Sequence, residues 1–214
     1  MSIALSLGNN LTTGGVFKAN AVNNTSCNNI TDFAGIAGSS TLVLLSTQTA
    51  SASASISFTT GIDSTYDEYV FKFINLHPST GATFQCNFST DGGSNYNVTK
   101  TSSFFYARHY EPDTPVGLEY EAGYDLAQST SYQILTDVNP INNDDCTSGY
   151  LHLFNPSSTT YVKQYLATTN SVYSIECFVG GYGNTTSAIN AVDFKYSTGN
   201  IDDGIIKMYG VAKA

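Results

Sequence analysis

The stretch "ATFQCNFSTDGGSNYNVTK", residues 82–100, decides the fold class. Its first part alternates apolar and polar residues, with Phe84, Cys86 and Phe88 on one face and polar residues between them. A period of two is typical of a strand that buries one face. A turn signal follows at once, so the stretch predicts a β protein.

The turn signal lies in "STDGGSNYN", residues 89–97. Asp-Gly-Gly supplies the positive-φ positions that tight hairpins require, and asparagine tolerates the left-handed region. The pattern predicts a hairpin tip that joins the strand at 82–89 to a second strand in "SSFFYARH", residues 102–109. The predicted turn residues are Asp91, Gly92, Gly93 and Asn95.

Similar β-rich runs occur along the rest of the chain, among them "DEYVFKFINL" (67–76), "GYLHLFN" (149–155) and "GIIKMYGVA" (204–212). Together they indicate about nine short strands at roughly ten-residue spacing, which predicts an all-β fold, a jelly-roll-like β-sandwich. The glycines of "VGGYGN", residues 179–184, predict a bend at which one strand crosses between the two sheets.

The N-terminal part of the chain differs in character. The first sixty residues contain two charged side chains, Lys18 and Asp32, and are dense in Gly, Ala, Ser, Thr and Asn. Such a segment cannot easily form a core of its own. We expect residues 1–50 to form an extended, irregular N-terminal arm and residues 51–214 to form the sandwich. A flexible tail and an arm ordered against a partner both fit this composition.

The overall charge restricts the partners. Charged residues make up 12% of the chain, against about a quarter in an ordinary globular domain. The net charge is -9, and eight Lys and Arg are spread over 214 residues, so we expect no nucleic-acid partner. "TLVLLS" (41–46) has four consecutive apolar residues, far short of a membrane span, and the first residues do not resemble a secretory signal. We expect synthesis in a cytoplasm and no membrane partner.

Residues able to perform chemistry are scattered. His77, His109 and His152 fall in separate runs without metal-ligand spacing, and no GxSxG motif occurs. The four cysteines lack CxxC spacing; their even number permits disulfides, but Cys86 and Cys177 alternate with apolar residues and are expected in the core. We therefore expect no catalytic, cofactor-binding or metal-binding residues and no cofactor, and we do not expect an enzyme.

The acid-rich segment "EPDTPVGLEYEAGYD", residues 111–125, is the remaining candidate. We interpret it as a solvated surface loop, while a carboxylate pair of the kind glycosidases use stays open. "NNDD" (142–145) and "DDGI" (202–205) contain oxygen ligands suited to calcium but lack the spacing of a calcium loop, and turns explain both. The residues of the candidate surface loop are Glu111, Asp113, Glu119, Tyr120, Glu121 and Tyr124.

Three segments carry a resemblance to a known group of proteins. They are "FSTDGGSNYNVTKT" (88–101), "FNPSSTTYVK" (154–163) and "GGYGNTTSAINAVDFKYSTGNIDDGIIKMYGV" (180–211). They resemble a family of β-rich virion structural proteins of tailed bacteriophages, frequent in marine phages, with a distinctive closing pattern that here runs from Tyr196 to Gly210. The resemblance implies a structural component of the head or tail and brings no catalytic residues.

Two functions follow as expectations. The first is a capsid decoration protein, of the cement or head-fibre type, that binds the major capsid protein through its arm. The alternative is a tail-fibre or receptor-binding module that presents tyrosine-rich loops to a host glycan. An enzyme such as a glycan depolymerase would depend on the acid-rich segment alone. The expected location is the virion, assembled in the host cytoplasm, and the expected partners are other virion proteins and further copies of the chain, with a trimer as the expected oligomer.

Overall fold

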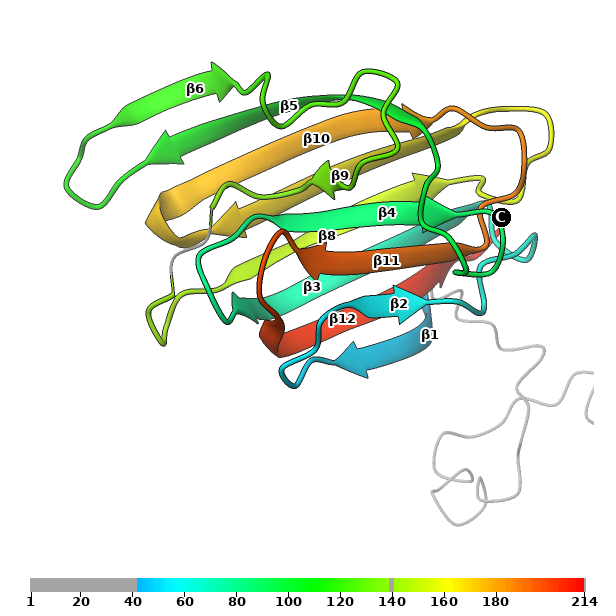
Figure 1. The fold of residues 1–214 in the computed structure, drawn as a ribbon, viewed down its shortest axis with the longest axis horizontal. Helices are drawn as coiled ribbons and strands as arrows, with labels where there is room; N and C mark the ends of the chain where they lie inside the picture. Colours follow the sequence, from blue (N-terminus) through cyan, green and yellow to red (C-terminus); the bar gives the residue numbers. More distant parts are fainter. Residues whose placement is uncertain (1–41, 139–140, 214) are drawn as a thin grey trace, which may run out of the picture. The chain divides into compact units, whose positions relative to one another are not determined.

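The computed structural model describes residues 42–138 and 141–213 (Figure 1). The predicted arm lies outside these residues over positions 1–41. The described part is almost entirely β, as predicted, with a single short 3-10 turn at Val172–Ser174.

Twelve strands of the described part form two antiparallel sheets. The eight-stranded sheet consists, in spatial order, of β1 (Leu42–Thr49), β12 (Ile201–Val211), β3 (Glu68–Pro78), β8 (Thr147–Phe154), β9 (Lys163–Ser171), β10 (Ile175–Gly183), β5 (Lys100–His109) and β6 (Val116–Tyr120). The four-stranded sheet consists of β2 (Ile56–Phe58), β11 (Ala191–Tyr196), β4 (Phe84–Ser89) and β7 (Gln133–Ile134).

Eight of these strands have jelly-roll connectivity. Strands from the first part of the chain pair with strands from the second part in nested order: β1 with β12, β2 with β11, β3 with β8, and β4 with β7. Alternate pairs belong to opposite sheets, as expected when one long folded ribbon wraps into two Greek keys. The predicted jelly-roll-like sandwich is therefore confirmed.

An aromatic cluster fills the space between the two sheets. The Phe194 ring lies 5.2 Å from the rings of both Phe71 and Phe73 across the sandwich, and it stacks on Phe84 of its own sheet at 5.9 Å. All four rings are almost completely buried. Edge-to-face and offset contacts of this kind each add about 0.5–1.5 kcal/mol to the effect of burial. Cys86 and Cys177 are also buried in the core as free thiols, as predicted.

The other four strands extend the larger sheet beyond this core. β5 and β6 are inserted between β4 and β7 in the chain, and β9 and β10 between β8 and β11. In Figure 1 these strands continue past the four-stranded sheet. Residues 121–137 cover part of their inner face: the Tyr124 ring packs on Phe104 at 5.1 Å, and Thr169 donates a 2.6 Å hydrogen bond to the Leu135 carbonyl. We call β9, β10, β5 and β6 the sheet extension.

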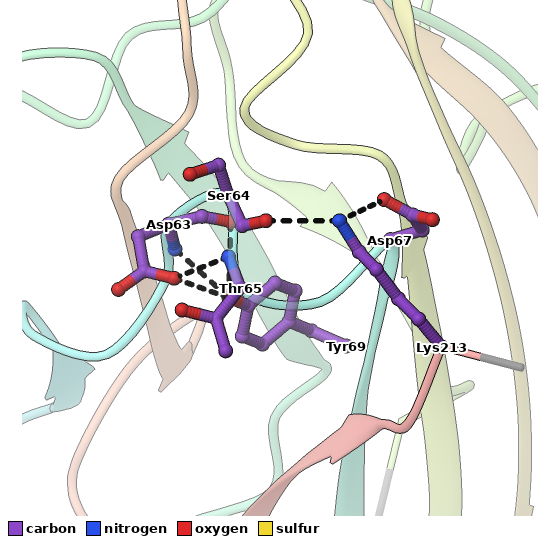
Figure 2. Close-up of polar contacts among 6 residues, drawn as sticks. All are labelled: Asp63, Ser64, Thr65, Asp67, Tyr69 and Lys213. Carbon is purple, nitrogen blue, oxygen red and sulfur yellow. Dashed lines mark hydrogen bonds and ion pairs between the residues drawn. The ribbon is translucent and has the colours of Figure 1, made fainter.

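The end of β12 is tied to the loop between β2 and β3. Lys213 donates to the Ser64 carbonyl and forms an ion pair with Asp67, both at 3.0 Å (Figure 2). Within the loop, hydrogen bonds from the Thr65 side chain and from the Thr65 amide to the Asp63 carboxylate lower the pKa of Asp63. The Tyr69 hydroxyl accepts a hydrogen bond from the Asp63 amide, so the loop is also anchored to β3.

The predicted hairpin at Asp91–Asn95 is wrong. β4 and β5 lie in different sheets, because β11 and β7 occupy the two edges of β4. The segment between them is a connection from one sheet to the other. Its turn chemistry is nevertheless as predicted: Gly92 and Gly93 have φ of 73° and 90°. The Asp91 carboxylate accepts hydrogen bonds from Ser89 and from both nitrogens of Asn95, which lowers its pKa to about 2.

Two boundaries also differ from prediction. The sandwich includes residues 42–49, which were assigned to the arm, because β1 pairs with β12 from Leu42↔Val211 to Thr49↔Ile205. The sequence of β1 does not alternate between apolar and polar residues, and its side chains are only partly buried, so its pattern does not predict a strand. The predicted bend at 179–184 is absent, since β10 runs unbroken to Gly183 between β9 and β5.

The glycines of β10 serve close packing. A methyl group on Gly181 would lie 2.6 Å from the Tyr165 hydroxyl and 2.7 Å from the Thr101 carbonyl oxygen. We expect Gly181→Ala to lower the free energy of unfolding by about 1–3 kcal/mol, as overpacking does. Urea unfolding measures it. Gly180→Ala is the matched control, because its methyl group would meet only the movable end of Leu166 at 3.3 Å and Ser103 at 3.9 Å. Equal losses for the two variants would contradict this explanation.

Candidate interaction surface

The outer face of the sheet extension exposes a band of large apolar side chains. Cross-strand pairing places Tyr120 of β6 beside Phe105 of β5, and Phe105 beside Phe178 of β10. Leu118 follows on β6 and is 71% exposed, while Leu166 on β9 is 54% exposed. Isolated apolar residues are normal on a protein surface, but contiguous apolar patches mark interaction sites. We call this band, Val116, Leu118, Tyr120, Phe105, Phe178 and Leu166, the outer apolar face.

A shallow groove lies within the outer apolar face. The rings of Phe105 and Phe178 stack with centroids 5.0 Å apart and planes 14° apart. Gly180 lacks a side chain between them and Leu166, which leaves a hollow of about 390 Å³. Stacked rings beside an aliphatic wall suit a planar or apolar group of a partner, such as a side chain or the apolar face of a sugar ring.

On the inner side of β6, Glu119 fixes the strand to β5. Its carboxylate accepts hydrogen bonds from Arg108 at 2.5 Å and from the Tyr106 hydroxyl at 2.8 Å. The bond to Glu119, together with burial, raises the pKa of Tyr106 to about 12. The Arg108 guanidinium also lies over the rings of Tyr106 and Tyr110. Glu119 is therefore engaged in an ion pair within the β5–β6 hairpin.

The structure separates the residues of the predicted surface loop. Residues 116–120 form β6, so the interpretation of the segment as one continuous loop is wrong; backbone pairing with β5 overrides its acidic composition. Glu111 and Asp113 lie in the turn before β6, where Asp113 contacts His109 at 2.9 Å. Glu121 accepts a hydrogen bond from the Gly123 amide.

The two tyrosines of that segment have opposite positions. Tyr120 points outward and donates to Asp125 at 2.5 Å. Tyr124 turns inward, packs on Phe104 and donates to Asp137 at 3.0 Å, and burial raises its pKa above the usual range. Only Tyr120 of the two belongs to the outer apolar face.

The two acidic turns, at residues 142–145 and 202–205, meet in space. Asn143, Asp144 and Asp145 line one hollow together with Asp202 and Asp203. Their oxygens serve the local backbone: Asp145 accepts from the Asn142 amide, and Asp203 from the Gly204 amide. Over residues 42–138 and 141–213, no group of three or more His, Cys, Asp or Glu side chains is arranged to hold a metal ion.

Sequence reasoning missed several buried charged side chains, among them Lys100, Lys163 and Asp193. The Lys100 side chain is fully buried on the same face of β5 as Phe104 and Tyr106. Its even spacing from these two aromatic residues is the sequence pattern that indicates its burial. The Nζ atom donates to Asn87 Oδ1 at 2.5 Å and to the Val98 carbonyl at 2.8 Å. Burial disfavours the charged form and lowers the pKa of Lys100 to about 8.

The buried amine predicts a pH-dependent stability. Between pH 8 and 10.5 the unfolded chain holds the Lys100 proton and the folded chain does not, so the contribution of Lys100 to stability increases with pH. Lys100→Met removes this pH-dependent contribution to stability. We expect the free energy of unfolding of the variant, relative to that of the natural chain, to fall by about 3 kcal/mol at most between pH 8 and pH 10.5.

Urea unfolding of both proteins at several pH values measures the difference, so that contributions from the cysteines and tyrosines cancel. Lys72→Met is the control, because Lys72 is an exposed lysine of the same sheet. A difference between Lys100→Met and the natural chain that does not change with pH would contradict the assignment.

The comparisons with known proteins do not extend these observations. The chain matches no family model, no curated protein and no solved structure. Within the described ranges, no helix is long and apolar enough to span a membrane.

Proposed function

We propose that this chain is a structural protein of a tailed-phage particle, and specifically a capsid decoration protein of the cement or head-fibre type. The outer apolar face supports an assembly role most directly, because a chain that works alone in solvent rarely keeps such a band uncovered. The low charge of the chain fits a surface that lies against other proteins. Jelly rolls occur in viral capsid domains, although the fold by itself does not define a function.

In this proposal the N-terminal segment attaches the sandwich to the major capsid protein. The support is compositional: two charges in sixty residues, with scattered apolar residues that can be buried against a partner. A segment that becomes ordered on binding can wrap a large surface. The sandwich then projects from the shell, with further copies or other virion proteins as neighbours.

A tail-fibre or receptor-binding module is the second candidate. The Phe105–Phe178 groove favours it, since stacked rings can bind the apolar face of a host glycan, and jelly rolls also occur in lectins. Purified chain should then compete with phage adsorption, and Phe178→Ala should remove the competition. No competition at saturating protein would exclude this candidate.

The copy number in purified particles separates the two candidates. Quantitative mass spectrometry against the major capsid protein should give on the order of hundreds of copies for a decoration protein, because the site repeats over an icosahedral shell. A few dozen copies or fewer would favour the tail. Absence of the chain from the particle would contradict both candidates.

Attachment through the N-terminal segment has its own test. We expect a chain lacking residues 1–41 to keep the thermal transition of the full chain, because it retains β1, and to lose binding to particles that lack the protein. Co-sedimentation with the particles measures binding, and the full-length chain is the control. Undiminished binding by the truncated chain would contradict the role of the segment.

A further inference from the structure

The β6 strand is an unpaired edge of the eight-stranded sheet with exposed apolar side chains. It ends the eight-stranded sheet, and in the part of the chain that the structure describes only β5 pairs with it. A strand uses alternate backbone groups for each neighbour, so one side of β6 offers N–H and C=O groups to a further strand. Its outward side chains, Val116, Leu118 and Tyr120, are 62%, 71% and 58% exposed.

The other sheet edges are protected against such pairing. β1 has a bulge between Leu44 and Ser46 and polar residues up to Thr49. β2 and β7 are three and two residues long. Short edges, bulges and charged side chains are the usual devices that block edge-to-edge association. β6 has a regular register, no lysine, and one acid, Glu119, which is bound to Arg108 on the inner side.

We propose that β6 pairs antiparallel with β6 of a second copy, about a twofold axis at Leu118, so that the two eight-stranded sheets become continuous. In this register Leu118 faces Leu118 of the second copy, and Val116 faces its Tyr120. Side chains directly opposite each other point to the same face of a sheet, so all of these apolar residues cover one another on the outer face. The two outer apolar faces merge into one surface.

The side chains of β6 favour this register over the two registers shifted by one residue at the axis. With the axis at Leu118, Glu119 faces Gly117 of the second copy, which has no side chain. With the axis at Glu119, two carboxylates would be opposite each other, which is unfavourable. With the axis at Gly117, Tyr120 would face Thr114 of the second copy, and the apolar contact between Tyr120 and Val116 would not form. The strand is thus complementary to itself in one arrangement.

The consequence is a twofold dimer as the basic unit, in contrast to the trimer expected from sequence. Such an isologous contact uses the same surface of both copies and closes on itself. The pairing is a property of the isolated chain, so it holds or fails independently of the phage assignment.

Disulfide trapping tests the register. In a full-length chain with Cys27→Ser and Cys146→Ser, mild oxidation of Leu118→Cys should give a covalent dimer on a non-reducing gel, because Cα atoms of directly opposed residues lie within disulfide range. Val116→Cys alone should give none, whereas Val116→Cys combined with Tyr120→Cys should restore it. Tyr161→Cys, 70% exposed on a loop, is the matched control and should remain monomeric.

Sedimentation of the chain without added cysteines tests the contact itself. We expect a concentration-dependent dimer, and a shift to monomer for Leu118→Lys, which places two ammonium groups opposite each other; Tyr161→Lys should leave the dimer unchanged. A monomer at every accessible concentration, a trimer, or a dimer that Leu118→Lys does not affect would each overturn the proposal. Equal trapping of Val116→Cys and Leu118→Cys would also overturn it.

Discussion

The contact between Phe194 and the rings around it holds the sandwich together. Phe194 lies on β11 in the smaller sheet, and Phe71 and Phe73 reach it from β3 in the larger sheet. Phe58 and Phe84 complete the cluster from the strands on either side of β11. β2, β3 and β4 follow one another in the chain, whereas β11 comes much later, so the cluster can form only when β11 has paired between β2 and β4. Packing and topology therefore depend on each other.

The sheet extension is a second structural layer with different requirements. Much of it continues past the four-stranded sheet, and residues 121–137 cover part of its inner face. That cover is more polar than the aromatic cluster: the Tyr165 hydroxyl donates to Gln133, and the Thr169 hydroxyl donates to the Leu135 carbonyl. The outer side has no cover in the described chain and carries the band of apolar side chains. The same insertion of strands thus accounts for the buried polar groups on one side and for the open band on the other.

The proposed assembly role is consistent with this asymmetry. The edge at β1 is bulged, whereas the edge at β6 is regular and is proposed to pair with itself, so the sheet can be extended at only one of its two edges. Growth by a twofold contact stops after one step, which avoids the open-ended association that exposed edges otherwise cause. The proposed phage role would give such a unit a place on a particle, and the proposed β6 contact would give it a way to assemble.

The sequence by itself determined the all-β class, most strand positions and the buried faces, because a period of two marks which side of a strand meets the core. Phe84, Cys86 and Phe88 are buried as their spacing predicts, and Gly92 and Gly93 take the positive φ that their turn requires. The tertiary structure alone decided which strand edges pair. Period two says nothing about edges, so β4 could not be seen to pair with β11 and β7, and Asp91–Asn95 was expected to close a hairpin. For the same reason β1 and β6 escaped notice: backbone pairing to β12 and β5 holds them in place, while their own side chains remain largely exposed.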